Sequence, residues 1–278
     1  MLDSPVLPVA AGLLADSWRR VADCAPALDV TVLTAARPTA PAGWLPLIGS
    51  AEQVGRAIAG EADRIRVAHG CEPPLPVAAS RLLHHYLWSL GVLAGGPWYL
   101  ERRVPRLRPE LLRTDPATGA LAVRPSGFAC LPDDPAAGRP GVRVLPGEAA
   151  LQAELRSAVA ESAEPLLAAF RPVLCRGPRA LWGMVADDLA SALWYLGRMR
   201  GEEERAVAAA TAVLPGGTPP FPGAADFRRL PGTRGGTHLT RTRLGCCLYY
   251  AIRPADACLT CPRTTDAERV RRLEAAGS

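Results

Sequence analysis

Lysine is absent from this chain, and all 32 of its basic residues are arginine. Alanine, glycine and proline are abundant, so the absence indicates a genome-wide codon bias and excludes no function by itself. Missing motifs exclude more. The sequence has no GxGxxG fingerprint after a strand, no phosphate-binding P-loop, no HExxH and no GxSxG. We therefore expect that the chain does not itself bind a nicotinamide cofactor.

Long apolar runs are lacking as well. A long uncharged run, residues 82–100, contains two histidines and a Gly-Gly-Pro break. A membrane-spanning helix needs about 20 mostly apolar residues, so this run predicts a buried helix and no transmembrane span. The absence of a transmembrane span is compatible with peripheral association with a membrane surface. Residues 1–18 carry Asp3 and no basic region, which argues against a secretory signal. We expect a cytoplasmic protein with reduced thiols, so its eight cysteines do not imply four disulfides.

What is present predicts an α+β fold, mainly α-helical with a small antiparallel β portion. The 278 residues, 49% of them hydrophobic, suit a single domain over residues 1–278, or two lobes at 1–145 and 146–278. Ser50 and Gln53 form a capping box before one helix, and Gly70 ends it. Helices are expected at residues 51–69, 76–93, 147–169, 178–199, 202–213 and 266–275, with a bend at Pro165. Strand-like runs lie at residues 28–34 and within 105–145, residues 1–48 are otherwise Pro- and Ala-rich, and 214–236 is a loop by composition.

The net charge of +5 is concentrated near the C-terminus. Residues 226–278 contain ten arginines and five acidic residues, whereas residues 1–225 contain 22 of each. The same region holds four of the eight cysteines, Cys246, Cys247, Cys258 and Cys261, within 16 residues. We call residues 241–263 the four-cysteine segment.

Four kinds of chemistry account for such a segment. Burial as small apolar residues suits the other four cysteines better, because Cys258 and Cys261 flank a turn. A redox Cys-x-x-Cys needs only two thiols and leaves Cys246 and Cys247 unused. Structural zinc needs four thiolates around one ion, which adjacent cysteines reach poorly. A two-iron cluster offers ligand positions on two metals. The spacing favours iron–sulfur, and zinc remains open.

The stretch "RLGCCLYYAIRPADACLTCP" resembles the signature of the FhuF-like ferric-siderophore reductases. The resemblance includes an Arg before the cysteine pair, a Tyr after it and a turn with Pro254 before Cys-x-x-Cys-Pro. It implies a C-terminal [2Fe–2S] segment with Cys246, Cys247, Cys258 and Cys261 as ligands and redox centre. The implied activity is one-electron reduction of a ferric siderophore of the hydroxamate type, releasing Fe(II) in the cytoplasm. At positions 244 and 245, the resemblance leads us to expect a more polar pair of residues. The pair Leu244-Gly245 departs from that expectation.

This hypothesis also predicts roles for several other residues and for a partner protein. Arg241 and Arg243 are predicted to lie at the cofactor, where positive charge stabilises a reduced cluster; Arg253 and Arg263 are also close in sequence. Electrons are expected from a separate ferredoxin or flavoprotein reductase, attracted by the basic end of the chain. The loop 214–245 and the aromatic residues Trp182, Trp194 and Tyr195 are candidates for the wall of a substrate site, but aromatic residues at this spacing are more often part of the core.

Two alternatives remain at this point. One is a structural zinc protein that binds a partner or nucleic acid through its basic tail; the leading hypothesis has no nucleic-acid partner. The other is a non-redox relative that binds siderophores. The histidine pair His84-His85 is interpreted as core, His238 as a loop residue, and Asp187-Asp188 as polar helix positions.

Overall fold

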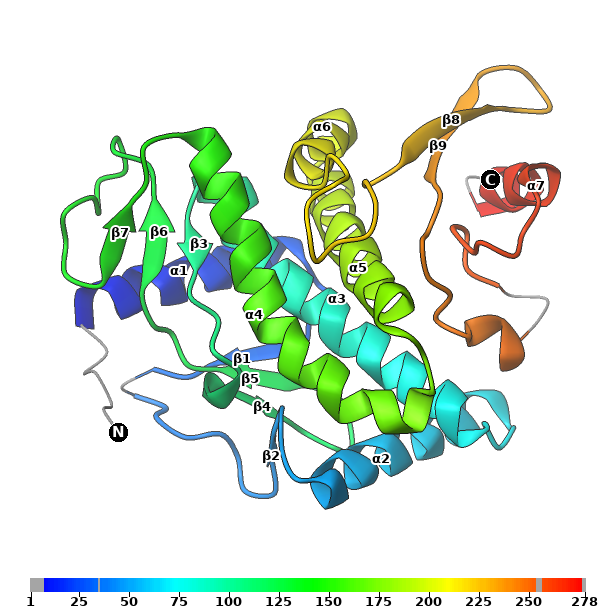
Figure 1. The fold of residues 1–278 in the computed structure, drawn as a ribbon, viewed down its shortest axis with the longest axis horizontal. Coiled ribbons are helices and arrows are strands. Elements are labelled where there is room, and N and C mark those ends of the chain that lie inside the picture. The colour runs from blue at the N-terminus through cyan, green and yellow to red at the C-terminus, as the bar shows by residue number, and fades with distance from the viewer. Residues whose placement is uncertain (1–7, 35, 254–256, 277–278) are drawn as a thin grey trace.

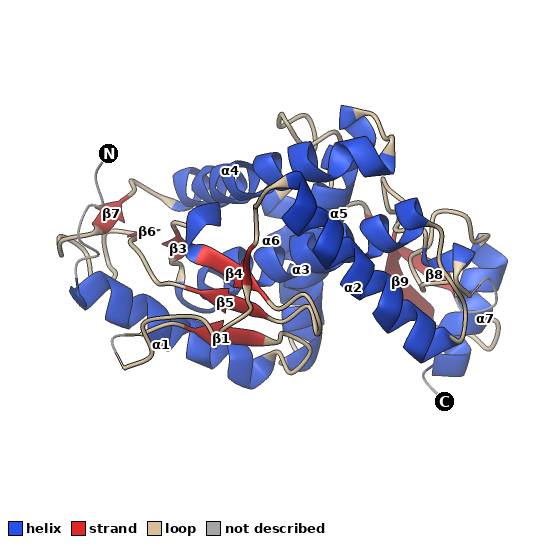
Figure 2. Ribbon diagram, turned by 90° about the horizontal axis from the view of Figure 1, so that it is seen from below, coloured by secondary structure: helices blue, strands red, loops and turns tan. Residues whose placement is uncertain are grey.

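The computed structural model describes residues 8–34, 36–253 and 257–276. Its helices form a central body, with strands β1–β7 on one side and β8, β9 and α7 on the other (Figures 1 and 2). The helices are α1 (Pro8–Cys24), α2 (Ala51–His69), α3 (Leu75–Glu101), α4 (Glu148–Leu174), α5 (Pro178–Met199), α6 (Glu203–Val213) and α7 (Asp266–Ala276), with 3-10 turns η1 (Pro109–Leu111) and η2 (Tyr249–Ala251). The mainly helical α+β prediction is confirmed. Among the described residues, no helix combines the length and apolar content needed to cross a membrane.

Helix α3 runs through the centre of the body and packs against α1, α2, α4 and α5. The predicted end near residue 93 is wrong, because the helix continues through the Gly-Gly-Pro sequence to Glu101. The reason is close packing. A Cβ on Gly96 would lie 2.6 Å from Cγ2 of Val21 in α1, and one on Gly91 would lie 3.0 Å from Cβ of Ala192 in α5. These glycines let neighbouring helices approach.

Helix α1 lies in a region for which the sequence predicted only one strand. Its apolar face repeats at Leu14, Trp18 and Val21, all buried, and the indole of Trp18 donates to the carbonyl of Leu93 in α3 at 2.9 Å. That spacing is helical, so a signal was present in the sequence. Residues 1–7, part of the stretch judged not to be a secretory signal, lie outside the described residues.

The other predicted helices agree closely with the structure. Ser50 and Gln53 form the predicted capping box of α2, and Gly70 ends that helix in the left-handed conformation. Helix α4 is longer than predicted, because it passes through both Pro165 and Pro172 and ends at Leu174.

The strands form two small sheets and a hairpin. The first sheet has the order β1 (Val30–Val32), β5 (Leu121–Val123), β4 (Leu112–Thr114), β2 (Leu45–Pro46); the second has β3 (Val104–Pro105), β6 (Phe128–Cys130), β7 (Val142–Val144). The small β portion around residues 105–145 is thus confirmed. Both sheets are mixed, since β1 pairs with β5 and β6 pairs with β7 in parallel.

The predicted loop at 214–236 contains a strand. Strand β8 (Phe227–Pro231) pairs antiparallel with β9 (Thr237–Arg241), in a register that sets Phe227 opposite Arg241. This hairpin lies beside α7 at one end of the molecule, and the strand β9 leads directly into the four-cysteine segment (Figure 1).

Candidate metal centre

The backbone that enters the first cysteine pair is held by a buried carboxylate of α5. Asp187 is fully buried. Its Oδ2 atom accepts from the N–H of Gly245 at 2.7 Å, and its Oδ1 atom accepts from the N–H of Leu244 at 3.1 Å. A Cβ on Gly245 would lie 3.1 Å from Cγ of Met184 in α5, so a larger residue would be crowded there. The close contact with α5 therefore accounts for a glycine at position 245, where the family resemblance predicts a more polar residue.

Two arginines of the segment complete this contact through buried ion pairs. Arg241, 1% exposed, donates to Oδ1 of Asp187 at 2.7 Å, and Arg243 donates to Oδ1 of Asp188 at 3.3 Å. Burial raises the pKa of Asp187, and the two guanidinium groups together with the N–H groups of Leu244 and Gly245 oppose that rise. The interpretation of Asp187 and Asp188 as ordinary polar helix positions is wrong, because both are buried charge partners of the four-cysteine segment.

Helix α3 contributes His84 to the same network. Its Nδ1 atom lies 2.6 Å from Oδ1 of Asp188, the oxygen that also accepts from Arg243. His85, the next residue, instead contacts the carbonyl of Gly119 through Nε2 at 2.8 Å. The adjacent histidines therefore face different surroundings, and only His84 points toward the four-cysteine segment.

The thiol of Cys247 neighbours that of Cys258, and Cys246 and Cys261 lie within range of charge interactions with this pair. Cys247 and Cys261 are buried, while Cys246 and Cys258 are half-buried. The neighbouring thiol of Cys258 lowers the pKa of Cys247, and the positive charge of Arg243 and Arg81 acts in the same direction. In the described part of the chain, no group of three or more His, Cys, Asp or Glu side chains is arranged to hold a metal ion.

The thiolate is the form that binds a metal, and Cys247 is favoured in that form, whereas burial raises the pKa of Cys246 and the neighbouring thiol of Cys247 raises the pKa of Cys258. The Sγ atom of Cys246 also lies 3.4 Å from the N–H of Leu248, which donates to it. Hydrogen bonds of this kind tune iron–sulfur centres. The donor set, four cysteine thiols in one segment, fits the Cys₄ ligation of a [2Fe–2S] cluster.

Comparison with protein families decides which kind of segment this is. Residues 243–263 match the family model described as the FhuF 2Fe-2S C-terminal domain. The four-cysteine segment is similar to this domain over those residues. The predicted resemblance is confirmed, and the cofactor of the domain is a [2Fe–2S] cluster. No curated protein matches the chain.

Arginines from outside the four-cysteine segment hold its backbone on either side of the cysteines. Arg176, between α4 and α5, donates to the carbonyl of Cys246 at 2.7 Å. Arg269 of α7, 2% exposed, donates to the carbonyl of Cys261 at 2.8 Å, and Arg272 donates to the carbonyl of Ala257 at 2.7 Å. Sequence reasoning missed Arg176 and Arg269, because no local pattern marks an arginine whose acceptor is a backbone carbonyl.

The arginines predicted at the cofactor differ in their surroundings. Arg243 lies close enough to Cys247 and Cys258 for their charges to interact. Arg241 is bonded to Asp187, to Ser191 and to the carbonyl of Ala225. Their role in cofactor binding stays a prediction. Arg263 stacks over the ring of Tyr250 at 4.4 Å, and the predicted turn residue Pro254 lies outside the described residues.

The three aromatic candidates for the wall of a substrate site have different surroundings. Trp194 lines a cleft beside the four-cysteine segment. Trp182 packs edge-on against Phe221, and Tyr195 packs edge-on against Trp88.

Proposed function

We propose that the chain is a ferric-siderophore reductase that works in the cytoplasm, with Cys246, Cys247, Cys258 and Cys261 as the ligands of its [2Fe–2S] cluster. The observation that carries this proposal is the FhuF 2Fe-2S match over residues 243–263, which contains all four cysteines. Such a cluster, when bound, supplies a one-electron carrier. The protein residues hold it and set its charge environment.

One electron is sufficient for iron release. Fe(III) in a siderophore is bound by hard oxygen donors, and one electron converts it to Fe(II), which the same oxygens bind weakly. The electron enters from a separate one-electron donor protein, a ferredoxin or flavoprotein reductase, and leaves on the iron. The substrate we propose is a hydroxamate complex.

The surroundings of the thiols support a cluster that accepts electrons. With four thiolates, an oxidised [2Fe–2S] centre carries a formal charge of about −2 and a reduced one about −3. The charge of Arg81 interacts with Cys247, and that of Arg269 interacts with Cys261 and Cys258. The charge of Arg243 also reaches Cys247, but the carboxylates of Asp187 and Asp188 balance it. Positive charge at this position favours the reduced form and raises the reduction potential.

An approach for the donor protein lies beside Cys261. A hollow of about 320 Å³ is lined by Cys261 itself and by Tyr250, Arg263, Arg272 and Glu268, and Glu268 pairs with Arg272 at 2.7 Å. Arginine at its rim suits an acidic donor, because opposite charges accelerate the encounter of two proteins.

The test is anaerobic purification followed by single-turnover reduction. The protein is expected to be red-brown, to contain two irons per chain and, once reduced, to yield Fe(II) from a ferric hydroxamate, reported by a ferrous chelator. A colourless protein that contains zinc, or an iron protein that leaves every ferric siderophore oxidised, would refute the proposal.

A further inference from the structure

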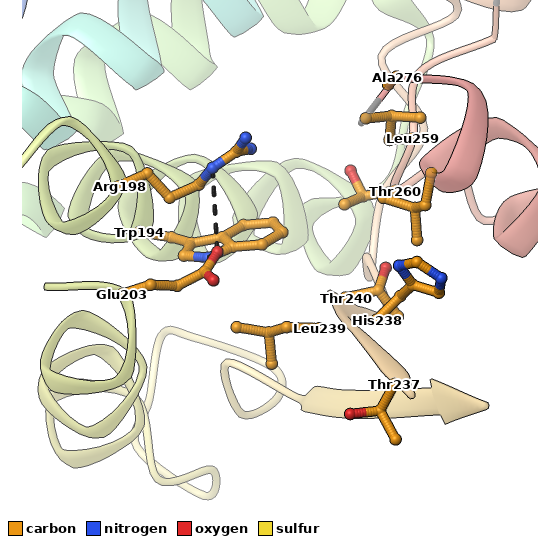
Figure 3. Close-up of a pocket in the computed structure, with 11 residues that line it drawn as sticks. Trp194, Arg198, Glu203, Thr237, His238, Leu239, Thr240, Leu259, Thr260 and Ala276 are labelled. Carbon is orange, nitrogen blue, oxygen red and sulfur yellow. Dashed lines mark hydrogen bonds and ion pairs between the residues drawn. The ribbon is translucent and has the colours of Figure 1, made fainter. Parts of the chain in front are cut away.

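A second feature beside the four-cysteine segment is a cleft of about 490 Å³ (Figure 3). Trp194 and Arg198 of α5 and Glu203 of α6 form one wall. The opposite side comprises Thr237–Thr240 of β9, Leu259 and Thr260, and Ala276 of α7. Leu273 of α7 also lines the cleft. The cleft therefore lies between the helical body and the C-terminal elements.

The position of Leu259 and Thr260 ties this cleft to the cysteines. They are the two residues between Cys258 and Cys261, so the Cα atom of each lies about 3.8 Å from that of a proposed ligand. A molecule in the cleft that contacts these two side chains lies against the cysteine turn. Such proximity is what electron transfer to a bulky complex requires.

The charges that line the cleft are paired. The carboxylate of Glu203 accepts from the indole N–H of Trp194 at 2.7 Å and lies 3.9 Å from the guanidinium of Arg198. Nε2 of His238 lies 3.5 Å from Oε1 of Glu274. The rest of the lining is threonine hydroxyls, leucines and alanine. Since each basic side chain already faces a carboxylate, the cleft offers little uncompensated charge to an anion.

We propose that this cleft is the docking site of the ferric complex and that it selects complexes without net charge. The inference rests on the proposed reductase function. Fe(III) with three hydroxamates is formally neutral, whereas Fe(III) with three catecholates carries three negative charges. Three unpaired negative charges brought into this lining would lose their hydration and gain no partner, whereas a neutral complex can bind through the threonine hydroxyls and the leucine side chains.

Gallium complexes test docking separately from reduction. Ga(III) takes the same oxygen ligands as Fe(III) and is not reduced by one electron, so calorimetric titration of the cluster-loaded protein with a Ga(III) trihydroxamate measures binding alone. Thr237 is exposed on β9, and Thr237→Trp fills the cleft from its rim. We expect this variant to raise the Kd at least tenfold with an unchanged visible spectrum. Thr211→Trp, exposed on α6 and two turns beyond Glu203, is the matched control and should stay within twofold.

A second variant tests charge selection. Glu203→Gln leaves Arg198 without its carboxylate partner, so binding of a Ga(III) tris-catecholate should strengthen at least threefold while trihydroxamate binding changes less than twofold. In the unaltered protein, the tris-catecholate should bind at least tenfold more weakly than the trihydroxamate. Equal affinity for the two complexes would overturn the charge selection.

The outcomes separate the site from the function. If Thr237→Trp binds the gallium complex as the unaltered protein does, or reduces the ferric complex at the same rate, the cleft is not the site and the reductase proposal stands. If the gallium complex binds in the cleft and the ferric complex is never reduced, the site stands and the reductase proposal falls.

Discussion

Helix α3 and the four-cysteine segment are fixed by different forces. Nineteen of the 27 residues of α3 are buried, and most of them are apolar. Among the described residues, the fully buried members of the main apolar core end at Ala225, before the segment begins. The segment is instead held by Asp187, by buried arginines and by hydrogen bonds to its own carbonyl groups.

This difference predicts different responses to the loss of a contact. Apolar burial is roughly proportional to area and tolerates small shifts of position. A buried ion pair depends on geometry, and removing one partner leaves the other charge uncompensated. We therefore expect the helical body to fold without the cofactor, and the four-cysteine segment to depend on both its ion pairs and its metal.

The strongest test removes a proposed ligand. Cys246→Ser should abolish the visible absorption and the bound iron, while far-UV circular dichroism of the helices stays within a tenth of the unaltered signal. Cys175→Ser is the control, because Cys175 is exposed and lies outside the segment. Loss of helical signal in Cys246→Ser would show that body and segment fold as one unit, which would break the comparison. Full iron content in that variant would remove Cys246 from the ligand set.

The next largest effect is expected from the buried carboxylate. Asp187→Asn removes the charge that faces Arg241 and Arg243, and breaking such a buried pair costs about 3–5 kcal/mol. Urea unfolding measures this loss, and iron per chain should fall with it. Arg241→Gln should recover part of the loss when combined with Asp187→Asn, since the two residues form one pair. Strictly additive losses in the double variant would show that the pair is not coupled.

Much of the fold could be predicted because its signals are local. The capping box at Ser50 and Gln53 placed the start of α2, and Gly70 placed its end. The end of α3 could not be placed, because a glycine that breaks a helix and a glycine that admits a neighbouring helix look alike in one sequence. Only the position of Val21, 75 residues before Gly96, distinguishes them.

The candidate site likewise has local features that the sequence predicts and long-range contacts that it does not. The cysteine spacing is local and distinctive, so the segment and its cofactor were predicted. The partnership of Asp187 with Arg241 joins residues 54 apart, and that of Arg176 with Cys246 joins residues 70 apart. The charge of a residue does not indicate which distant residue it pairs with. Two adjacent acids within the apolar stretch 183–193 were a usable hint, because buried carboxylates are rarely left unpaired.

A substitution in the apolar core tests whether the helical body is stabilised independently of the four-cysteine segment. Leu90→Ala in α3, where the side chain is 1% exposed, should lower the free energy of unfolding by about 2–5 kcal/mol. Iron content and the visible spectrum should not change while the body remains folded. Val67→Ala, at a position 84% exposed, should change stability by no more than about 0.5 kcal/mol. Iron loss in Leu90→Ala below its unfolding transition would contradict the independence of the two regions.

A smaller effect is expected on the redox potential. The guanidinium of Arg81 lies 5.0 Å from the ring centre of Tyr249, and its charge interacts with Cys247. Arg81→Gln should make the reduction potential more negative by up to about 60 mV, a tenfold change for one electron. Potentiometric titration monitored by electron paramagnetic resonance measures it. Arg56→Gln, exposed on α2, should leave the potential unchanged; an equal shift in both variants would make the effect one of net charge rather than position.

The smallest expected effect lies at the cap of α2. Ser50→Ala removes the acceptor of the Gln53 N–H and should cost about 0.5–2 kcal/mol, whereas Ser50→Gly should cost only a few tenths. Thermal unfolding of both variants checks this order. The opposite end of α2 contacts the four-cysteine segment, where His69 meets the ring of Tyr249 edge-on at 5.9 Å. If the two regions are stabilised separately, neither variant changes iron retention, and a change in Ser50→Ala alone would identify α2 as a mechanical link between them.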